Sequence, residues 1–199
     1  MEAVVLAAGE GRRLRPLTER WPKPILPIDG KPVIVTLLRE LEAAGVSEVT
    51  VVVGHLGEQI RSLLDGFSVR FAEQPGVLGS ADALRRAVES GARPPFIVSV
   101  ADTVFAPGDL QRFVETWRQS GADAALAPPL WGVGPEVLRQ LDGLPGPPYE
   151  LQALFAHAQE AGTDVVSVEL GPIRSLTEPA DVVKHNFVYL GEWTDERDL

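Results

Sequence analysis

Short apolar runs rich in β-branched residues alternate along the chain with longer amphipathic stretches. The apolar runs predict strands at residues 3–7, 48–53, 68–73, 96–100, 122–127 and 164–169. The stretches between them repeat apolar residues at helical spacing and predict helices at residues 32–44, 57–64, 80–90, 107–120 and 149–161. This alternation is typical of an α/β fold, with a mostly parallel sheet between helical layers.

The alternation is interrupted in two places, and the tail of the chain fits neither pattern clearly. The first connection, residues 8–31, is unusually long, and long ordered loops in compact domains are usually functional. Residues 128–148 are rich in proline and glycine, with a short apolar piece at 130–133 and a helix candidate at 135–141. The tail at 187–199 begins apolar and ends acidic, so we expect it either to add an edge strand or to pack on a partner chain.

Composition narrows the class of protein. Of the 199 residues, 45% are apolar and none is cysteine, which favours an ordered core and excludes disulfides, thiolate zinc sites and cysteine nucleophiles. No apolar run approaches the ~20 residues of a membrane helix. The first arginines follow the apolar stretch at 3–8 rather than preceding it, unlike a signal peptide. We therefore expect a cytoplasmic protein.

Charge is unevenly distributed. The net charge of −10 argues against nonspecific binding of nucleic acid or of anionic membranes. Residues 1–31 are nevertheless net positive; their basic side chains are Arg12, Arg13, Arg15, Arg20, Lys23 and Lys31. A basic loop in an acidic protein predicts a small anionic ligand, with a solvated arginine-rich loop as the alternative.

The turn after the first strand reads Ala-Gly-Glu-Gly-Arg-Arg-Leu at residues 8–14. Gly9 and Gly11 allow a tight turn whose N–H groups approach phosphate oxygens. The turn is not a dinucleotide fingerprint, because Leu14 occupies the third glycine position, and no Walker lysine-serine pair is present.

The same loop continues into a longer pattern. Residues 6–18 run on to Pro-Lys-Pro-Ile-Leu-Pro at 22–27 and Gly-Lys-Pro at 30–32. This stretch resembles the amino-terminal motif of the sugar-phosphate nucleotidylyltransferases, the pyrophosphorylases that make nucleotide sugars. The resemblance implies a GT-A, or nucleotide-diphospho-sugar transferase, fold, with a Rossmann-like mixed central sheet flanked by helices. It also implies Mg²⁺-dependent transfer of NMP from a nucleoside triphosphate to a phosphorylated acceptor, with release of pyrophosphate.

By this resemblance the first loop holds the triphosphate. The residues expected to bind the nucleotide there are Leu6, Ala8, Gly9, Gly11, Arg12, Arg13 and Lys23. Among them, Arg13 is expected at the β- and γ-phosphates and Lys23 at the α-phosphate. Arginine binds phosphate oxygens bidentately, whereas lysine acts as a point charge.

A second run, Glu-Gln-Pro-Gly-Val-Leu-Gly-Ser-Ala at 73–81, resembles the base-recognition segment of the family. Gln74, Gly79 and Ser80 are therefore expected at the base. The amide of Gln74 offers one donor group and one acceptor, which favours a uridine or thymidine nucleotide and leaves guanine and cytosine open. Ser80 is also a candidate N-cap for the following helix.

Asp102 follows the strand predicted at 96–100, where the family places a Gly-Asp pair whose carboxylate binds Mg²⁺. Mg²⁺ prefers oxygen ligands and often takes one or two carboxylates together with phosphate oxygens. The alternative for Asp102 is a helix cap. Arg13, Lys23 and Asp102 are the candidate catalytic residues.

The resemblance weakens after about residue 110. The Glu-Lys-Pro segment that holds the sugar phosphate has no counterpart, and no lysine lies between Lys31 and Lys184. Ser175 stands where the family has a second metal-binding aspartate, with Glu178, Asp181 or Glu169 as candidate substitutes.

We interpret the chain as one domain, 1–199, with a nucleotide-binding half at 1–110 and a reduced acceptor half at 111–199. A sugar 1-phosphate is the expected acceptor. Three alternatives stay open. The acceptor is a small non-sugar phosphate, or a homo-oligomer supplies the missing acceptor residues, or the chain is a nucleotide-binding regulatory subunit without turnover.

Overall fold

A seven-stranded sheet in the order β10-β8-β9-β6-β1-β4-β5 forms the centre of the fold. Its strands are β1 (Glu2–Ala7), β4 (Glu48–Val53), β5 (Val69–Glu73), β6 (Phe96–Val100), β8 (Ala124–Ala127), β9 (Leu130–Val133) and β10 (Val165–Ser167). β1 pairs in parallel with β4 and β6, while β9 runs antiparallel between β6 and β8. The predicted mixed sheet is confirmed. The structure is a computed structural model that describes residues 1–195, with side chains described as far as Phe187.

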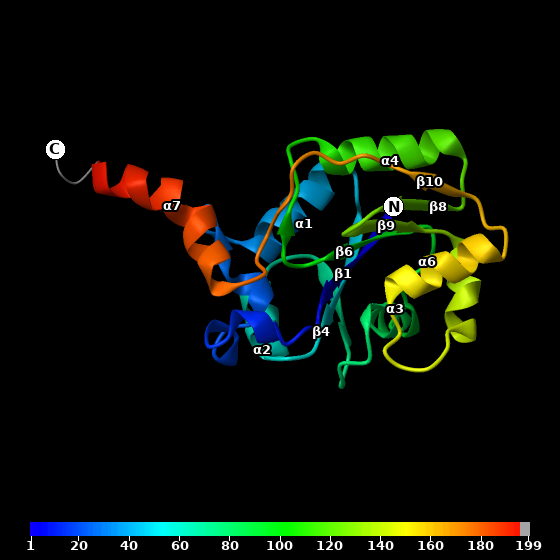
Figure 1. The fold of residues 1–199 in the computed structure, drawn as a ribbon, viewed down its shortest axis with the longest axis horizontal. Coiled ribbons are helices and arrows are strands. Elements are labelled where there is room, and N and C mark those ends of the chain that lie inside the picture. The colour runs from blue at the N-terminus through cyan, green and yellow to red at the C-terminus, as the bar shows by residue number, and fades with distance from the viewer. Residues whose placement is uncertain (196–199) are drawn as a thin grey trace.

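Helices cover both faces of the sheet. One face carries α1 (Val33–Ala43), α2 (Gly57–Leu63) and α4 (Asp109–Ser120). The other carries α3 (Ser80–Glu89), α5 (Pro135–Arg139) and α6 (Leu151–Glu160), with the short 3-10 helix η4 (Gln140–Gly143) after α5. Figure 1 shows α4 above the strands and α3 and α6 below them.

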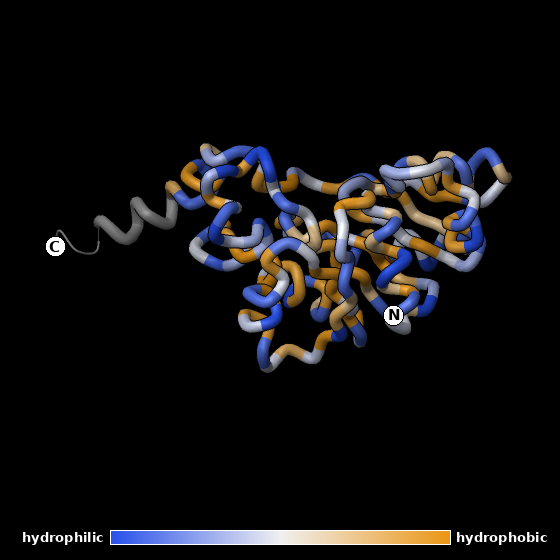
Figure 2. Tube along the Cα trace, turned by 90° about the horizontal axis from the view of Figure 1, so that it is seen from below, coloured by the Kyte–Doolittle hydropathy of each residue, from blue (hydrophilic) through white to orange (hydrophobic). Residues whose placement is uncertain are grey.

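The two cores follow from the alternation of side chains along the strands. In β1, Ala3 and Val5 join the core under α1 and α4, whereas Val4 joins the core under α3 and α6. All three are at most 1% exposed. In Figure 2, hydrophobic segments run through the middle of the trace.

The long connection between β1 and α1 is ordered because it has a core of its own. It contains the 3-10 helices η1 (Arg12–Leu14), η2 (Leu17–Glu19) and η3 (Lys23–Ile25) and the hairpin β2 (Pro27–Ile28) and β3 (Lys31–Pro32). Its small buried cluster consists of Leu14, Leu26, Ile28, Val33, Val104 and Leu176. The loop that carries most of the basic residues is therefore anchored to the rest of the protein on its apolar side.

The end of the chain differs from the prediction. The last strand, β11 (Arg174–Ser175), pairs antiparallel with β7 (Thr103–Val104). It is followed by α7 (Pro179–Asp195), which extends away from the sheet in Figure 1. The expectation of an edge strand in the tail is wrong for residues 187–195, because proline at the first helical position and a capping Asp181 start a helix. Residues 196–199 of that tail lie outside the described residues, and packing on a partner chain stays a prediction.

Asn186, near the middle of α7, is 7% exposed and connects this helix to the β2–β3 hairpin. Its Nδ2 donates to Pro27 O at 2.9 Å, and its Oδ1 accepts from Gly30 N at 2.8 Å. The hairpin that follows Lys23 is thereby tied to α7. Over residues 1–195, the helices are either too short or too polar to cross a membrane.

Candidate active site

A cavity of about 400 Å³ opens at the carboxyl ends of β1, β5 and β6. β1 and β6 are neighbours in the sheet, so the loops that follow them meet, as at the usual ligand site of open α/β sheets. The cavity is lined by every residue predicted to bind the nucleotide or the metal in the first half of the chain: Leu6, Ala8, Gly9, Gly11, Arg12, Arg13, Lys23, Gln74, Gly79, Ser80 and Asp102. Segments far apart in sequence are thus brought together at one site.

The glycine turn after β1 presents free backbone donors. Gly11 has φ +61°, and a Cβ there would lie 2.8 Å from Thr18 Cγ2, so this position requires glycine. Thr18 Oγ1 donates to Gly11 O at 2.9 Å and holds the turn. Within the described part of the chain, the N–H groups of Gly9 and Glu10 donate to no protein atom. Such unpaired N–H groups form a concave anion site.

Lys23 and Asp102 form an ion pair at one end of the cavity. Lys23 comes from η3, between the buried Pro22 and Pro24, and Asp102 comes from the turn between β6 and β7. Both side chains are only about one-fifth exposed, at 19% and 20%. Opposite charges with limited access to water are therefore placed together where the loops of β1 and β6 meet.

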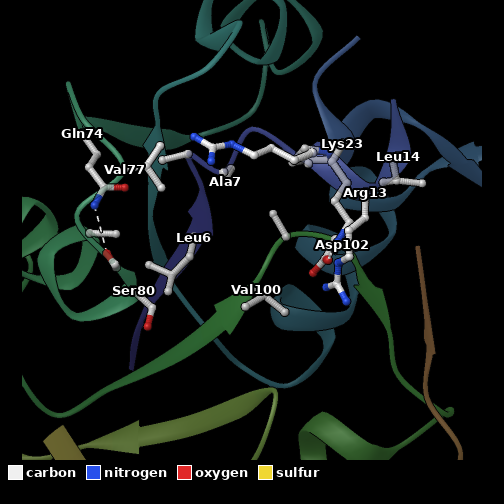
Figure 3. Close-up of a pocket in the computed structure, with 18 of the residues that line it drawn as sticks. Leu6, Ala7, Arg13, Leu14, Lys23, Gln74, Val77, Ser80, Val100 and Asp102 are labelled. Carbon is white, nitrogen blue, oxygen red and sulfur yellow. Dashed lines mark hydrogen bonds and ion pairs between the residues drawn. The ribbon is translucent and has the colours of Figure 1, made fainter. Parts of the chain in front are cut away.

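The two arginines of the glycine turn differ in their partners. Arg12 Nε donates to Glu10 Oε2 at 2.6 Å, and this hydrogen bond holds the pKa of Glu10 below its usual value. Arg13 forms no ion pair with any carboxylate in residues 1–187. Figure 3 places Arg13 beside Asp102 at the Lys23 end of the cavity. Arg13 is thus a cation available to an anionic ligand.

The opposite end of the cavity is built from hydrogen bonds. Gln74 is 8% exposed, and its Nε2 donates to Gly79 O at 3.0 Å and to Asp82 Oδ2 at 2.9 Å. Ser80 Oγ donates to Glu150 Oε2 at 2.6 Å and accepts from Leu151 N at 2.9 Å. Figure 3 shows Gln74 and Ser80 together, away from Lys23 and Asp102.

The prediction that Ser80 caps its own helix is wrong. Gly79 is the N-cap of α3, and Ser80 is the first helical residue. The hydroxyl of Ser80 instead accepts a hydrogen bond from the first N–H of α6, and so satisfies a free donor of that helix. Gly79 is required here, because its φ is +105° and a Cβ would lie 2.2 Å from Tyr149 O.

Sequence reasoning missed Glu150 and Thr177, which also line the cavity. Glu150 reaches the site because α6 docks beside α3, and it lies 70 residues from its partner Ser80. No local pattern marks such a contact. Thr177 follows β11 in the chain. It reaches the cavity because β11 pairs with β7, the strand that comes directly after Asp102.

The three candidate substitutes for a second metal ligand lie outside the cavity lining. Asp181 Oδ2 accepts from Thr177 N at 2.7 Å and from Glu178 N at 2.9 Å, and these bonds hold the pKa of Asp181 low. Its carboxylate is therefore engaged at the start of α7. Glu178 and Glu169 are exposed side chains beyond the cavity. Within the described residues, no three His, Asp or Glu side chains form a metal-binding cluster.

Ser175 lies next to the loop of Asp102, because it pairs with Thr103 in the two-stranded sheet of β7 and β11. The structure therefore brings a neutral hydroxyl, rather than a second carboxylate, to this place. Asp102 and Glu150 are the carboxylates that line the described cavity, one at each end.

The fold and the cavity are those of an α/β protein with a ligand site at the carboxyl ends of its parallel strands. The sequence model of the MobA-like NTP transferase domain matches residues 3–145, and the chain belongs to this family. The resemblance to the sugar-phosphate nucleotidylyltransferases is confirmed by the relatives that follow.

UTP–glucose-1-phosphate uridylyltransferase AglF of Haloferax volcanii is 39% identical over 129 residues, which are 63% of this chain and 52% of that protein. N-acetylmuramate α-1-phosphate uridylyltransferase of Neisseria meningitidis is 36% identical over 110 residues, 52% of this chain and 48% of the relative. The chain thus spans about half the length of these curated relatives. The structure of UDP-glucose pyrophosphorylase from Acinetobacter baumanii matches with a TM-score of 0.77 at 17% identity, covering 94% of this chain and 92% of the other. This likeness shows the fold.

Proposed function

We propose that the chain is a nucleotidyltransferase that moves NMP from a nucleoside triphosphate to a phosphorylated acceptor, with release of pyrophosphate. The observation that carries the proposal is the single cavity that joins the Gln74 end to the Lys23–Asp102 end through the glycine turn. Membership of the MobA-like family supports it, as do the uridylyltransferase activities of the named relatives. A sugar 1-phosphate is the acceptor that these relatives favour.

In the proposed reaction, an oxygen of the acceptor phosphate attacks the α-phosphorus in line. A new P–O bond forms as the bond to the β-phosphate breaks, and pyrophosphate carries away the electron pair. Lys23 places its charge at the α-phosphate, and Arg13 binds the β- and γ-phosphates. The N–H groups of Gly9 and Gly11, in the glycine turn, donate hydrogen bonds to the phosphate oxygens and hold the triphosphate in place. Positioning and neutralisation of charge supply the catalysis in such transfers.

The donor set of the cavity fits a magnesium ion held mainly by substrate. Asp102 supplies one carboxylate, and phosphate oxygens and waters complete the ligand set that Mg²⁺ prefers. When bound, Mg²⁺ would neutralise negative charge on the phosphates. Asp102 would then serve two groups, the ion and Lys23, and would set the position of both.

The second half of the chain is proposed to hold the acceptor. We divide the domain at about residue 110, with β8, β9 and β10 forming a reduced acceptor half. Two observations favour a binding subunit without turnover: Ser175 lies beside Asp102, and the Glu-Lys-Pro segment has no counterpart in this chain. Lys23 and Asp102, paired in the same cavity, favour catalysis over that alternative. A cytoplasmic location and a homo-oligomeric state remain predictions.

The test is pyrophosphate release with Mg²⁺ for each nucleoside triphosphate, against a pool of sugar 1-phosphates and small phosphorylated alcohols. We expect release with at least one pair of substrates and its loss in Asp102→Asn. Glu178→Gln is the matched control, because Glu178 follows β11 in the chain but lies outside the cavity lining. If no acceptor in the pool gives pyrophosphate release although the nucleotide still binds, the result would support the binding-subunit alternative.

A further inference from the structure

The glycine turn at residues 8–11 needs support from elsewhere in the protein to act as an anion site. Glycine loses more conformational freedom on folding than any other residue, and this turn has Gly9 and Gly11 one residue apart. The N–H groups of Gly9 and Glu10 bind an anion together only if they point to the same place, because hydrogen bonds weaken steeply as they depart from linear geometry. What holds the turn therefore decides how well it binds phosphate.

Behind the turn lies a second cavity rather than a packed core. It has a volume of about 360 Å³ and opens at the carboxyl ends of β4 and β5. Ala8 and Glu10 line it from the turn, and Gly54 and His55 line it from the end of β4. Close packing is therefore reduced on this side of the turn, which leaves hydrogen bonds to fix its shape.

His55 supplies two of these hydrogen bonds. Its backbone N–H donates to Ala8 O at 3.3 Å, at the start of the turn. Its ring Nε2 lies 2.9 Å from Thr18 O, and because a carbonyl oxygen only accepts, Nε2 must carry the hydrogen. Gly54 permits this close approach, since a Cβ there would lie 2.9 Å from Ala8 O. The end of β4 is thereby bonded to both ends of the loop that runs from Ala8 to Thr18.

Thr18 passes this support on to the turn. It is 1% exposed, and its Oγ1 donates to Gly11 O at 2.9 Å. Gly11 in turn lies against Lys23, because a Cβ added to Gly11 would be 3.4 Å from Lys23 Cβ. A change at His55 is therefore transmitted through Thr18 to the N–H groups of the turn and to its contact with Lys23. His55 itself lies outside the lining of the 400 Å³ cavity that holds Lys23.

We propose that His55 is a positioning residue, which holds the glycine turn through Ala8 and Thr18 in the shape that binds the β- and γ-phosphates. This inference rests on the proposed function in one respect, that the turn receives a triphosphate. It assigns His55 no contact with the ligand. Its consequence is selective, because binding of a triphosphate depends on His55, whereas a monophosphate lacks the two phosphates that the turn holds.

The test is calorimetry on the full chain, with Mg²⁺ and without acceptor, using UTP, dTTP, GTP, CTP and ATP and the monophosphate of each. In the unaltered protein we expect the best-bound triphosphate to bind more tightly than its monophosphate. His55→Phe keeps an aromatic ring and removes the Nε2 hydrogen, so we expect affinity for that triphosphate to fall about three- to tenfold. Affinity for the monophosphate should change by less than about twofold.

Three results of this experiment would overturn the inference. The first is an unaltered protein that binds triphosphate no more tightly than monophosphate. The second is a loss in His55→Phe that is equal for the two ligands, as a merely structural role of the histidine predicts. The third is no loss for either ligand.

His55→Gln is the rescue variant, because the Nε2 of glutamine is also an N–H donor, at about the same reach from the backbone. We expect it to restore most of the triphosphate affinity, and a loss as large as that of His55→Phe would contradict the proposed hydrogen bond. Should His55→Phe not fold, Thr18→Val tests the next link, since it removes the hydroxyl and keeps a branched side chain. An unchanged ratio of triphosphate to monophosphate affinity in Thr18→Val would overturn the inference equally.

His157→Phe is the matched control. His157 is also a half-buried histidine, but it lies on α6 and lines neither of the two cavities. We expect this variant to leave the ratio of triphosphate to monophosphate affinity unchanged.

The same measurements separate this inference from the proposed function. If the unaltered protein releases pyrophosphate while His55→Phe keeps the normal affinity ratio, the transferase stands and the inference fails. If the ratio falls in His55→Phe but no acceptor gives pyrophosphate release, the inference stands and catalysis is contradicted. If no nucleotide binds, both are overturned.

Discussion

The two ends of the cavity are built on different physical principles. At the Gln74 end, a buried amide has both its hydrogens committed to protein acceptors, and Gly79 lets the chain pass within contact of Tyr149. At the other end, Lys23 and Asp102 meet as charges that are about one-fifth exposed. Hydrogen bonds with a fixed direction suit recognition of a base, whereas charges with limited access to water act strongly on a centre where bonds form and break.

The sharpest way to break this comparison is to remove the charge of Lys23. Lys23→Met should lower turnover by about 10²- to 10³-fold, because the charge acts on the reacting phosphate, and should weaken nucleotide binding much less. Steady-state kinetics alongside calorimetry measures both. Lys31→Met is the control, since Lys31 is an exposed lysine of the same loop that lies outside the cavity lining. Equal losses in turnover and affinity would make Lys23 a ground-state binding residue.

At the recognition end, Gly79→Ala should destabilise the fold by about 2–4 kcal/mol, through positive φ and the clash with Tyr149. Gly45→Ala separates the two causes, because Gly45 also has positive φ, +82°, but a Cβ at that position would have no neighbour within 4 Å. Urea unfolding of both variants is the measurement. If the two variants lose the same free energy of unfolding, close packing against Tyr149 adds nothing to the cost at Gly79, and the prediction is wrong.

Behind the reacting end, burial raises the pKa of Glu40 to about 7, and within residues 1–187 its buried Oε2 has no hydrogen-bond partner. The folded state therefore binds the proton more tightly than the unfolded state, so stability is greatest below pH 4.5 with respect to this group and falls as pH rises to 7. Glu40→Gln should remove that fall and gain about 1–3 kcal/mol at pH 8. Denaturant unfolding across this pH range, with the exposed Glu42→Gln as control, measures it. A pH profile unchanged by Glu40→Gln would contradict the assignment.

The smallest effect concerns the link between the Lys23 loop and β11. Arg174 donates to both oxygens of Asp29, at 2.7 and 2.5 Å, and holds the pKa of Asp29 below its usual value. Because both side chains are more than one-third exposed, Asp29→Asn should cost at most about 1 kcal/mol, and less at high salt. Asparagine keeps the positive φ of this turn position, so charge alone is changed. A loss well above this value would show that the ion pair organises the loop.

Much of the fold was predictable because the decisive signals are local. β1, β4 and β6 are near-continuous apolar runs, and each was predicted within a residue or two of its observed bounds. Two local signals were present but overlooked. Asp29-Gly30 between Ile28 and Lys31 is a typical two-residue hairpin turn, and Pro179 with Asp181 marks the start of α7.

The site divides in the same way. The residues of the glycine turn and Lys23 lie within one continuous motif, so sequence alone could place them together. Glu150 meets Ser80 because α6 packs beside α3, and Asp82 meets Gln74 because α3 packs against β5. No spacing in the chain encodes those contacts. Local sequence patterns therefore identified the reacting end of the cavity better than the base end.

The most direct measurement of the central claim is ³¹P NMR of a reaction containing Mg²⁺, the best-bound nucleoside triphosphate and a sugar 1-phosphate. We predict that signals of a diphosphodiester and of free pyrophosphate grow in equal amounts, and that neither appears with Asp102→Asn. Bound nucleotide with unchanged triphosphate and sugar phosphate signals, across the acceptors that the relatives' names define, would contradict the assignment of this chain as a nucleotidyltransferase.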